Sequence, residues 1–162
     1  MTKDVILWTG AGQIGMAIAR RIGYGKKIIV GDKNIKNAKE IARIMTNAGF
    51  GIEPVEGDIS SRTSILNMIT IGQKYGVIPT LINSAGVSPS QASIEIILKV
   101  DLYGTAVLLE EVGKVIKSGG RGITISSQSG YRMPALTPEE DEQLACTPTE
   151  ELLDLEILNP KI

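Results

Sequence analysis

The chain has 162 residues, of which 43% are apolar and 22% charged, a composition typical of one globular domain with its own core. It has no histidine and a single cysteine, which excludes histidine-based triads, an internal disulfide and most zinc sites. The charge is divided unevenly: residues 1–132 carry 16 basic and 10 acidic side chains, whereas residues 133–162 carry one basic and eight acidic ones.

The basic side chains are scattered and form no run of the kind that binds nucleic acid. No apolar run reaches the roughly 20 residues of a membrane-spanning helix, and the chain starts with a strand-like run rather than a signal peptide. The lone thiol of Cys146 fits a reducing compartment. We therefore expect a cytoplasmic protein with neither a nucleic-acid nor a membrane partner.

The chain opens with a strand, a glycine-rich turn and a helix. Residues 5–8 form an apolar run that predicts a buried strand, and residues 12–22 are good helix formers. Residues 9–15 between them have the spacing G-x-G-x-x-G, which in this context is the fingerprint of dinucleotide binding. A tight turn without a ligand is the competing interpretation, and the acidic residue after the second strand disfavours it.

Each glycine of the turn has its own role in that fingerprint. Gly10 permits the tight turn, Gly12 lets the backbone approach a diphosphate, and Gly15 lets the helix pack close to the sheet. The helix start, at Gln13 and Ile14, presents free N–H groups and the positive end of the helix dipole. We expect these five residues to bind the diphosphate.

Strands and helices alternate along the rest of the chain. Further strands are predicted at residues 27–31, 51–56, 79–83 and 122–126. Asn34 and either Ser60 or Ser61 are suitable N-caps for the helices that follow the second and third strands.

Two expectations concern the third strand and the long helical segment. Pro54 has no N–H to donate, so its strand should lie near an edge of the sheet. The helical segment covers about residues 90–117, and we expect a break near Asp101 or Gly104 and an end at Gly119–Gly120.

Five strands alternating with helices predict an α/β fold, a Rossmann-like doubly wound parallel sheet with helices on both faces. We assign residues 1–130 to a dinucleotide-binding domain. Residues 131–162 form an acidic segment that breaks the alternation, and its Thr137-Pro138 and Thr147-Pro148 pairs both indicate helix starts. Two alternatives stay open for the structure of this segment: two short helices or a mobile insertion. Two also stay open for its role: a lid over the site or an inert surface excursion.

Asp32 at the end of the second strand stands where the fingerprint has its acidic residue. A carboxylate there accepts hydrogen bonds from ribose hydroxyls and repels a 2′-phosphate, which favours NAD over NADP. NADP stays open because Lys33 or Lys36 could reach such a phosphate, and a helix-capping acid is the alternative interpretation.

Polar and small residues also follow the other strands. Asp58 can reach an adenine amino group or serve as a turn residue before Ser60, and the small residues after Asn83 keep a crevice open. A serine-rich run at residues 126–130 ends the fifth strand. Ligands of open α/β sheets bind outside the carboxyl ends of the strands, so we expect one site there.

The order of these motifs resembles the short-chain dehydrogenase/reductase family. Over residues 4–130 the matching elements are the glycine turn, Asp32, Gly57-Asp58-Ile59, Asn83-Ser84-Ala85-Gly86, Val100–Gly104 and Ile123–Gly130. The resemblance implies an NAD(P)-dependent oxidoreductase that transfers a hydride between nicotinamide and a small-molecule alcohol or carbonyl. It also implies homo-oligomers formed through the helix around residues 101–117.

The resemblance implies roles for single residues. Ser127 matches the catalytic serine that holds the substrate oxygen, and Asp101 stands where the family usually has an asparagine that helps to carry a proton-relay water. The implied cofactor contacts after the third and fourth strands are Asp58, Ile59, Asn83, Ala85 and Gly86.

The family's catalytic Tyr-x-x-x-Lys motif has no match here, because none of the four tyrosines has a lysine four positions on. We expect that motif on the remainder of the protein, C-terminal to this chain. Two alternatives stay open: a non-catalytic NAD(P)-binding module or sensor, and an unconventional use of Tyr131 or an acid. A methyltransferase that binds S-adenosylmethionine is a third class, which the motifs after Asn83 and around Ser127 disfavour.

Overall fold

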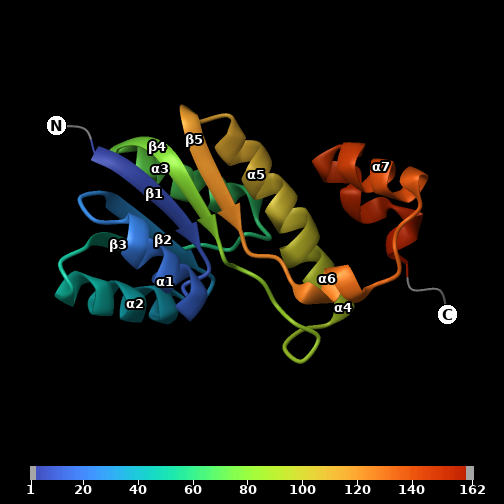
Figure 1. The fold of residues 1–162 in the computed structure, drawn as a ribbon, viewed down its shortest axis with the longest axis horizontal. Helices are drawn as coiled ribbons and strands as arrows, with labels where there is room; N and C mark the ends of the chain where they lie inside the picture. The colour runs from blue at the N-terminus through green and yellow to red at the C-terminus, as the bar shows by residue number, and fades with distance from the viewer. Residues whose placement is uncertain (1–2, 160–162) are drawn as a thin grey trace.

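The computed structural model describes residues 3–159 and contains one five-stranded sheet (Figure 1). The strand order is β3-β2-β1-β4-β5, with every neighbouring pair parallel. The strands are β1 (Lys3–Thr9), β2 (Lys27–Asp32), β3 (Gly51–Glu56), β4 (Gly76–Asn83) and β5 (Ile116–Thr124). The predicted sheet is confirmed, and Pro54 lies in the edge strand β3 as expected.

Helices cover both faces of the sheet because its strands alternate apolar side chains between two cores. Ile6 and Trp8 of β1 face a core shared with α1 (Gln13–Ile22) and α2 (Ile35–Asn47). Val5 and Leu7 face the opposite core, which is shared with α3 (Arg62–Gln73) and α5 (Thr105–Gly113). All four of these β1 side chains are fully buried.

The predicted helix caps are present. The Asn34 side chain accepts a hydrogen bond from the Lys36 N–H at 3.1 Å, and the Ser61 side chain accepts one from the Ser64 N–H at 3.3 Å. Of the two serines considered, Ser61 is therefore the N-cap of α3.

The prediction between residues 90 and 126 was partly wrong. The helical segment runs only from Ile94 to Gly113, as α4 (Ile94–Ile97), the π-helical η1 (Leu98–Gly104) and α5. Gly119 and Gly120 do not end it but lie inside β5. Gly119 has φ +76°, and the β4–β5 register shifts nearby, so these glycines form an irregularity that the strand passes through.

The acidic segment is helical in short pieces: α6 (Gln128–Arg132), α7 (Pro138–Cys146), and the 3-10 helices η2 (Thr149–Asp154) and η3 (Glu156–Leu158). The predicted start at Thr137 is confirmed by a capping box with Glu140. A helix also starts at the Thr147-Pro148 pair as predicted, since η2 begins at Thr149, but Thr147 is the C-cap of α7 and Pro148 is the N-cap of η2. The side chain of Pro148 has no acceptor for the free N–H groups at the start of η2. Among residues 3–159, no helix is both long and apolar enough to cross a membrane.

Candidate dinucleotide site at the carboxyl edge of the sheet

Two glycines of the turn are required by the packing around them. Gly10 has φ +80°, and its N–H donates to the Gly31 carbonyl at 2.8 Å. A side chain at Gly10 would overlap the backbone of Ala85, and one at Gly15 would overlap the indole of Trp8 and the hydroxyl of Ser84. The turn is therefore pressed against both its own strand and the end of β4.

Trp8 and Ser84 connect the turn to β4, a role that the sequence analysis missed. The Trp8 Nε1–H donates to the Gly10 carbonyl at 2.8 Å and to Ser84 Oγ at 2.9 Å. Ser84 Oγ in turn donates to the Thr9 carbonyl at 3.0 Å. A lone tryptophan in a strand gives no sequence signal of this contact beyond its position just before the glycine turn.

Gly12 differs from its neighbours because its free side faces open space. A Cβ placed there would meet no atom of residues 3–159 within 4 Å. Gly12 is also the N-cap of α1, and within the described chain no side chain caps this helix. The first-turn N–H groups, including those of Gln13 and Ile14, are therefore available to an external acceptor. The Ile14 side chain is 59% exposed.

Asp32 lies beside this turn and is held by backbone donors. Its Oδ2 accepts from the Ala11 N–H at 2.9 Å, and its Oδ1 accepts from the Asn34 N–H at 2.8 Å. Oδ1 also accepts from Asn37 Nδ2 at 3.4 Å, whereas Oδ2 keeps a second acceptor position for a ligand. The capping interpretation and the ligand interpretation of this residue are compatible.

Asp58 forms an ion pair with Lys33. Its Oδ2 lies 3.0 Å from Lys33 Nζ, and its Oδ1 accepts from Ser60 Oγ at 2.6 Å. Partial burial alone would raise the pKa of Asp58, but the hydrogen bonds from Ser60 and Lys33 outweigh it and lower that pKa. Asp58 is therefore an anion at neutral pH, and Lys33 is drawn toward it.

Two adjoining cavities follow the carboxyl edge of the sheet. We call the first, of about 350 Å³, the glycine-turn cavity; its lining includes Gly10, Gly12, Asp32, Asp58, Ile59 and Val100. We call the second, of about 560 Å³, the serine cavity; its lining includes Ser88, Gln91, Asp101, Thr105 and Ser127. Residues 84–87 line both, so Ala85 and Gly86 lie where the two cavities meet.

The predicted residue Asn83 is buried at the end of β4 and is not among the residues that line the two cavities. Its side chain is 1% exposed. Its Oδ1 accepts from Thr9 Oγ1 at 2.8 Å, and its Nδ2 donates to Thr105 Oγ1 at 3.3 Å. Asn83 therefore joins β1, β4 and α5, and the neighbouring small residues form the floor of the crevice.

Asp101 and Ser127 both line the serine cavity, but each already has a backbone partner. Asp101 Oδ1 accepts from the Val87 N–H at 3.0 Å. Ser127 is the N-cap of α6, and its Oγ accepts from the Ser129 N–H at 3.1 Å. Tyr131 is 92% exposed and lines neither cavity. The lining of both cavities also includes no residue from 133 to 159, so the acidic segment lies away from the crevice.

Comparison with known proteins agrees with this geometry. Residues 4–138 match the family model described as short chain dehydrogenase. The chain belongs to the short-chain dehydrogenase/reductase family. The match covers the five strands, both cavities and the beginning of the acidic segment.

Similar proteins are longer than this chain. A short-chain dehydrogenase/reductase of Alternaria brassicicola is 35% identical over 100% of this chain and 60% of that protein. The tropinone reductase-like 3 protein of Erythroxylum coca is 27% identical over 82% of this chain and 55% of that protein. The chain thus spans little more than half the length of these relatives. A short-chain dehydrogenase structure from Mycobacterium smegmatis shares the fold, with a TM-score of 0.71, 21% identity, and 95% of this chain and 68% of that one covered.

Proposed function

We propose that this chain is the dinucleotide-binding part of an oxidoreductase that transfers a hydride between NAD(P) and a small alcohol or carbonyl compound. The observation that supports this most is the open side of Gly12 at an uncapped helix start. Within the family, an uncapped helix start beside a bare glycine suits a diphosphate. We assign residues 1–130 to this domain.

The side chains around the glycine-turn cavity fit the rest of a dinucleotide. The N–H groups of the first turn of α1 would bind the diphosphate, Asp32 would accept from the adenosine ribose, and Asp58 would accept from the adenine amino group. NAD is favoured over NADP because the Asp32 carboxylate would repel a 2′-phosphate. The pairing of Lys33 with Asp58 supports the same preference, since it engages one of the two lysines that could reach a 2′-phosphate.

The serine cavity is the proposed place of the substrate. When bound at the junction of the two cavities, the nicotinamide supplies or accepts the hydride. Ser127 would hold the substrate oxygen through its hydroxyl, and Asp101 would keep the loop at Val87 in place. A proton donor is needed beside the developing alkoxide, and we assign it to a tyrosine and lysine on the remainder of the protein. We further propose that the protein forms homo-oligomers through the helix around residues 101–117.

Isothermal titration of the full protein with nucleotide offers a direct test. We expect saturable binding of NADH at lower concentration than of NADPH, and turnover with a member of a panel of secondary alcohols, sugars and steroids. Binding without turnover would instead identify a dinucleotide-binding module, and no binding of either nucleotide would refute the proposal.

A further inference from the structure

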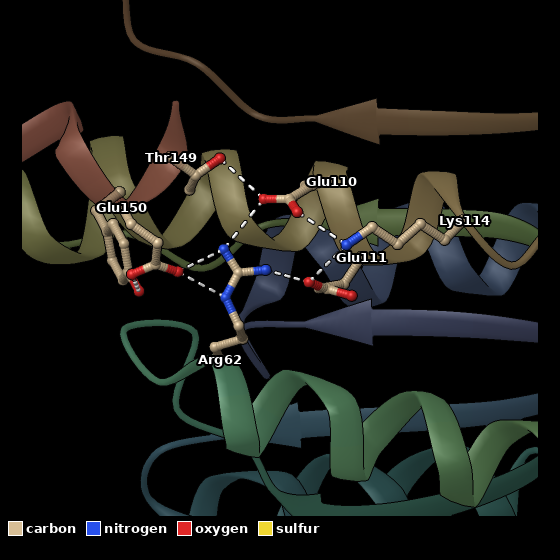
Figure 2. Close-up of polar contacts among 7 residues, drawn as sticks. Arg62, Glu110, Glu111, Lys114, Thr149 and Glu150 are labelled. Atoms are coloured by element: carbon tan, nitrogen blue, oxygen red, sulfur yellow. Dashed lines mark hydrogen bonds and ion pairs between the residues drawn. The ribbon is translucent and has the colours of Figure 1, made fainter. Parts of the chain in front are cut away.

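Arg62, at the start of α3, gathers three carboxylates from distant parts of the chain (Figure 2). Its Nη2 lies 3.0 Å from Glu110 Oε2 and 2.7 Å from Glu150 Oε1, and its Nη1 pairs with Glu111. Glu110 and Glu111 lie on α5, which packs beside α3, whereas Glu150 lies on η2 in the acidic segment. Hydrogen bonds from Arg62 and Lys114 lower the pKa of Glu110 to about 2.

The same part of η2 makes two further polar contacts with the domain and has one buried side chain. Thr149 Oγ1 donates to Glu110 Oε2 at 2.9 Å (Figure 2), and the Tyr103 hydroxyl donates to Glu150 Oε2 at 3.3 Å. Leu152 is 2% exposed, although its neighbours Glu151 and Leu153 are exposed. We call residues 149–154 the strap, because they fasten the acidic segment to α3, α5 and η1.

The π-helical turn η1 contacts the strap and also contributes residues to the crevice. The strap packs on η1, with Tyr103 as its polar contact. Val100 of η1 lines the glycine-turn cavity and Asp101 lines the serine cavity. Gly104 at its end lies against the Ile59 carbonyl, where a side chain would not fit. A π-helical turn is less regular than an α-helix and is often found at functional sites.

We propose that the strap positions η1 for dinucleotide binding, with Arg62 and Glu150 as positioning residues that never touch the ligand. The inference rests on the proposed function. The strap holds Tyr103 through Glu150, and Tyr103 belongs to the same turn as Val100 and Asp101, which line the cavities. A dinucleotide binds the arrangement in which these two residues line the crevice, so releasing the strap reduces the fraction of chains that are ready to bind.

The size of the effect follows from the exposure of the contacts. The Glu150 side chain is 65% exposed, and exposed ion pairs contribute little, so Glu150→Gln should raise the Kd for NADH by about twofold to fivefold. Leu152 is buried, so Leu152→Ala should detach the strap more completely and raise the Kd by about tenfold. Glu151→Gln is the matched control. It removes the same charge one residue away in η2, from an exposed side chain.

The test is isothermal titration of the full protein and its three variants with NADH, combined with hydrogen exchange of residues 98–104 and 149–154. We expect the order of affinity to be wild type and Glu151→Gln, then Glu150→Gln, then Leu152→Ala. Because coupling is reciprocal, NADH should also slow exchange in the strap of the wild type, which a merely stabilising segment would not show.

The outcomes separate the two proposals. Wild-type binding with an unchanged Kd in Glu150→Gln and Leu152→Ala would overturn the strap inference and leave the dinucleotide site standing. An equal loss of affinity in Glu151→Gln would also overturn it, because net charge would then be the cause. A wild type that binds no NADH would overturn the proposed function and with it the role of the strap.

Discussion

Gly12→Val separates ligand binding from folding more cleanly than any other change at this site. Gly12 has φ −113° and ψ 176°, an extended conformation that valine adopts readily. Within the described chain, the space beside it is open. The new side chain should therefore fit the free protein and project into the region where a diphosphate must approach the backbone.

The expected change in stability is small because two effects oppose each other. Replacing glycine where the backbone is compatible gains about 0.4–1 kcal/mol through the unfolded chain. Replacing glycine by valine at an N-cap costs about 0.5–1 kcal/mol. The free energy of unfolding should stay within about 1 kcal/mol, which is a shift in Tm of about 2–4 °C.

The expected change in binding is large. Loss of two backbone hydrogen bonds to a charged phosphate, each worth about 1.5–3 kcal/mol, weakens binding by about 3–6 kcal/mol. The Kd for NADH should therefore rise about 10²- to 10⁴-fold.

Isothermal titration with NADH and thermal unfolding of the same samples measure both quantities. Gly10→Ala is the contrasting variant, because its positive φ and the contact with Ala85 predict a loss of stability. If Gly12→Val bound NADH with the wild-type Kd while remaining folded, the reasoning about the glycine turn would be refuted.

Three further predictions concern charge. Asp32→Ala should bring the Kd values for NADH and NADPH closer together by at least about tenfold, and parallel titrations that show an unchanged ratio would contradict the role of Asp32. Hydrogen bonds from Arg62 and Lys114 lower the pKa of Glu110 from its ordinary 4.5 to about 2, so the folded state binds fewer protons than the unfolded chain, and stability should decrease as the pH is lowered from about 4.5 to 2. Glu110→Gln should flatten that slope in urea unfolding, and an equal slope would count against the Arg62 network. Tyr75→Phe removes the hydroxyl that donates to Glu53 from an exposed side chain, so it should lower the Tm only slightly and leave the Kd for NADH unchanged, and a raised Kd would contradict the placement of the site.

The position of the crevice could be predicted because it depends on short-range patterns. Apolar runs gave the strands, and the carboxyl ends of parallel strands meet at one edge. Gly10, Gly12, Asp32 and Asp58 all line the same cavity because each lies at or within a few residues of the carboxyl end of a strand. Local sequence decides such positions.

The errors arose where tertiary packing overrides a local signal. Gly119 and Gly120 would end an isolated helix, yet pairing with β4 carries β5 through them. The π-helical η1 ends at Gly104, which lies against Ile59, a contact between residues 45 positions apart that local sequence does not reveal. The assignment of Asn83 to the cofactor from its motif stays a prediction, and its partners Thr9 and Thr105 are apparent only once β1, β4 and α5 are assembled.

The strap had no sequence signal beyond its charge. Arg62 and Glu150 are 88 residues apart, and an acidic run alone is as consistent with a solvated surface as with a docked one. The burial of Leu152 shows that this part of the acidic segment is docked, and the ion pair with Arg62 shows that Glu150 is an acid with a partner in the domain.

A crystal structure of the full protein with NAD bound would test the central claim most directly. The account predicts the diphosphate against the backbone of Gly12 at the first turn of α1, with the adenosine ribose within hydrogen-bonding distance of Asp32. Nucleotide density elsewhere on the protein, with this edge of the sheet occupied only by solvent at saturating NAD, would contradict it.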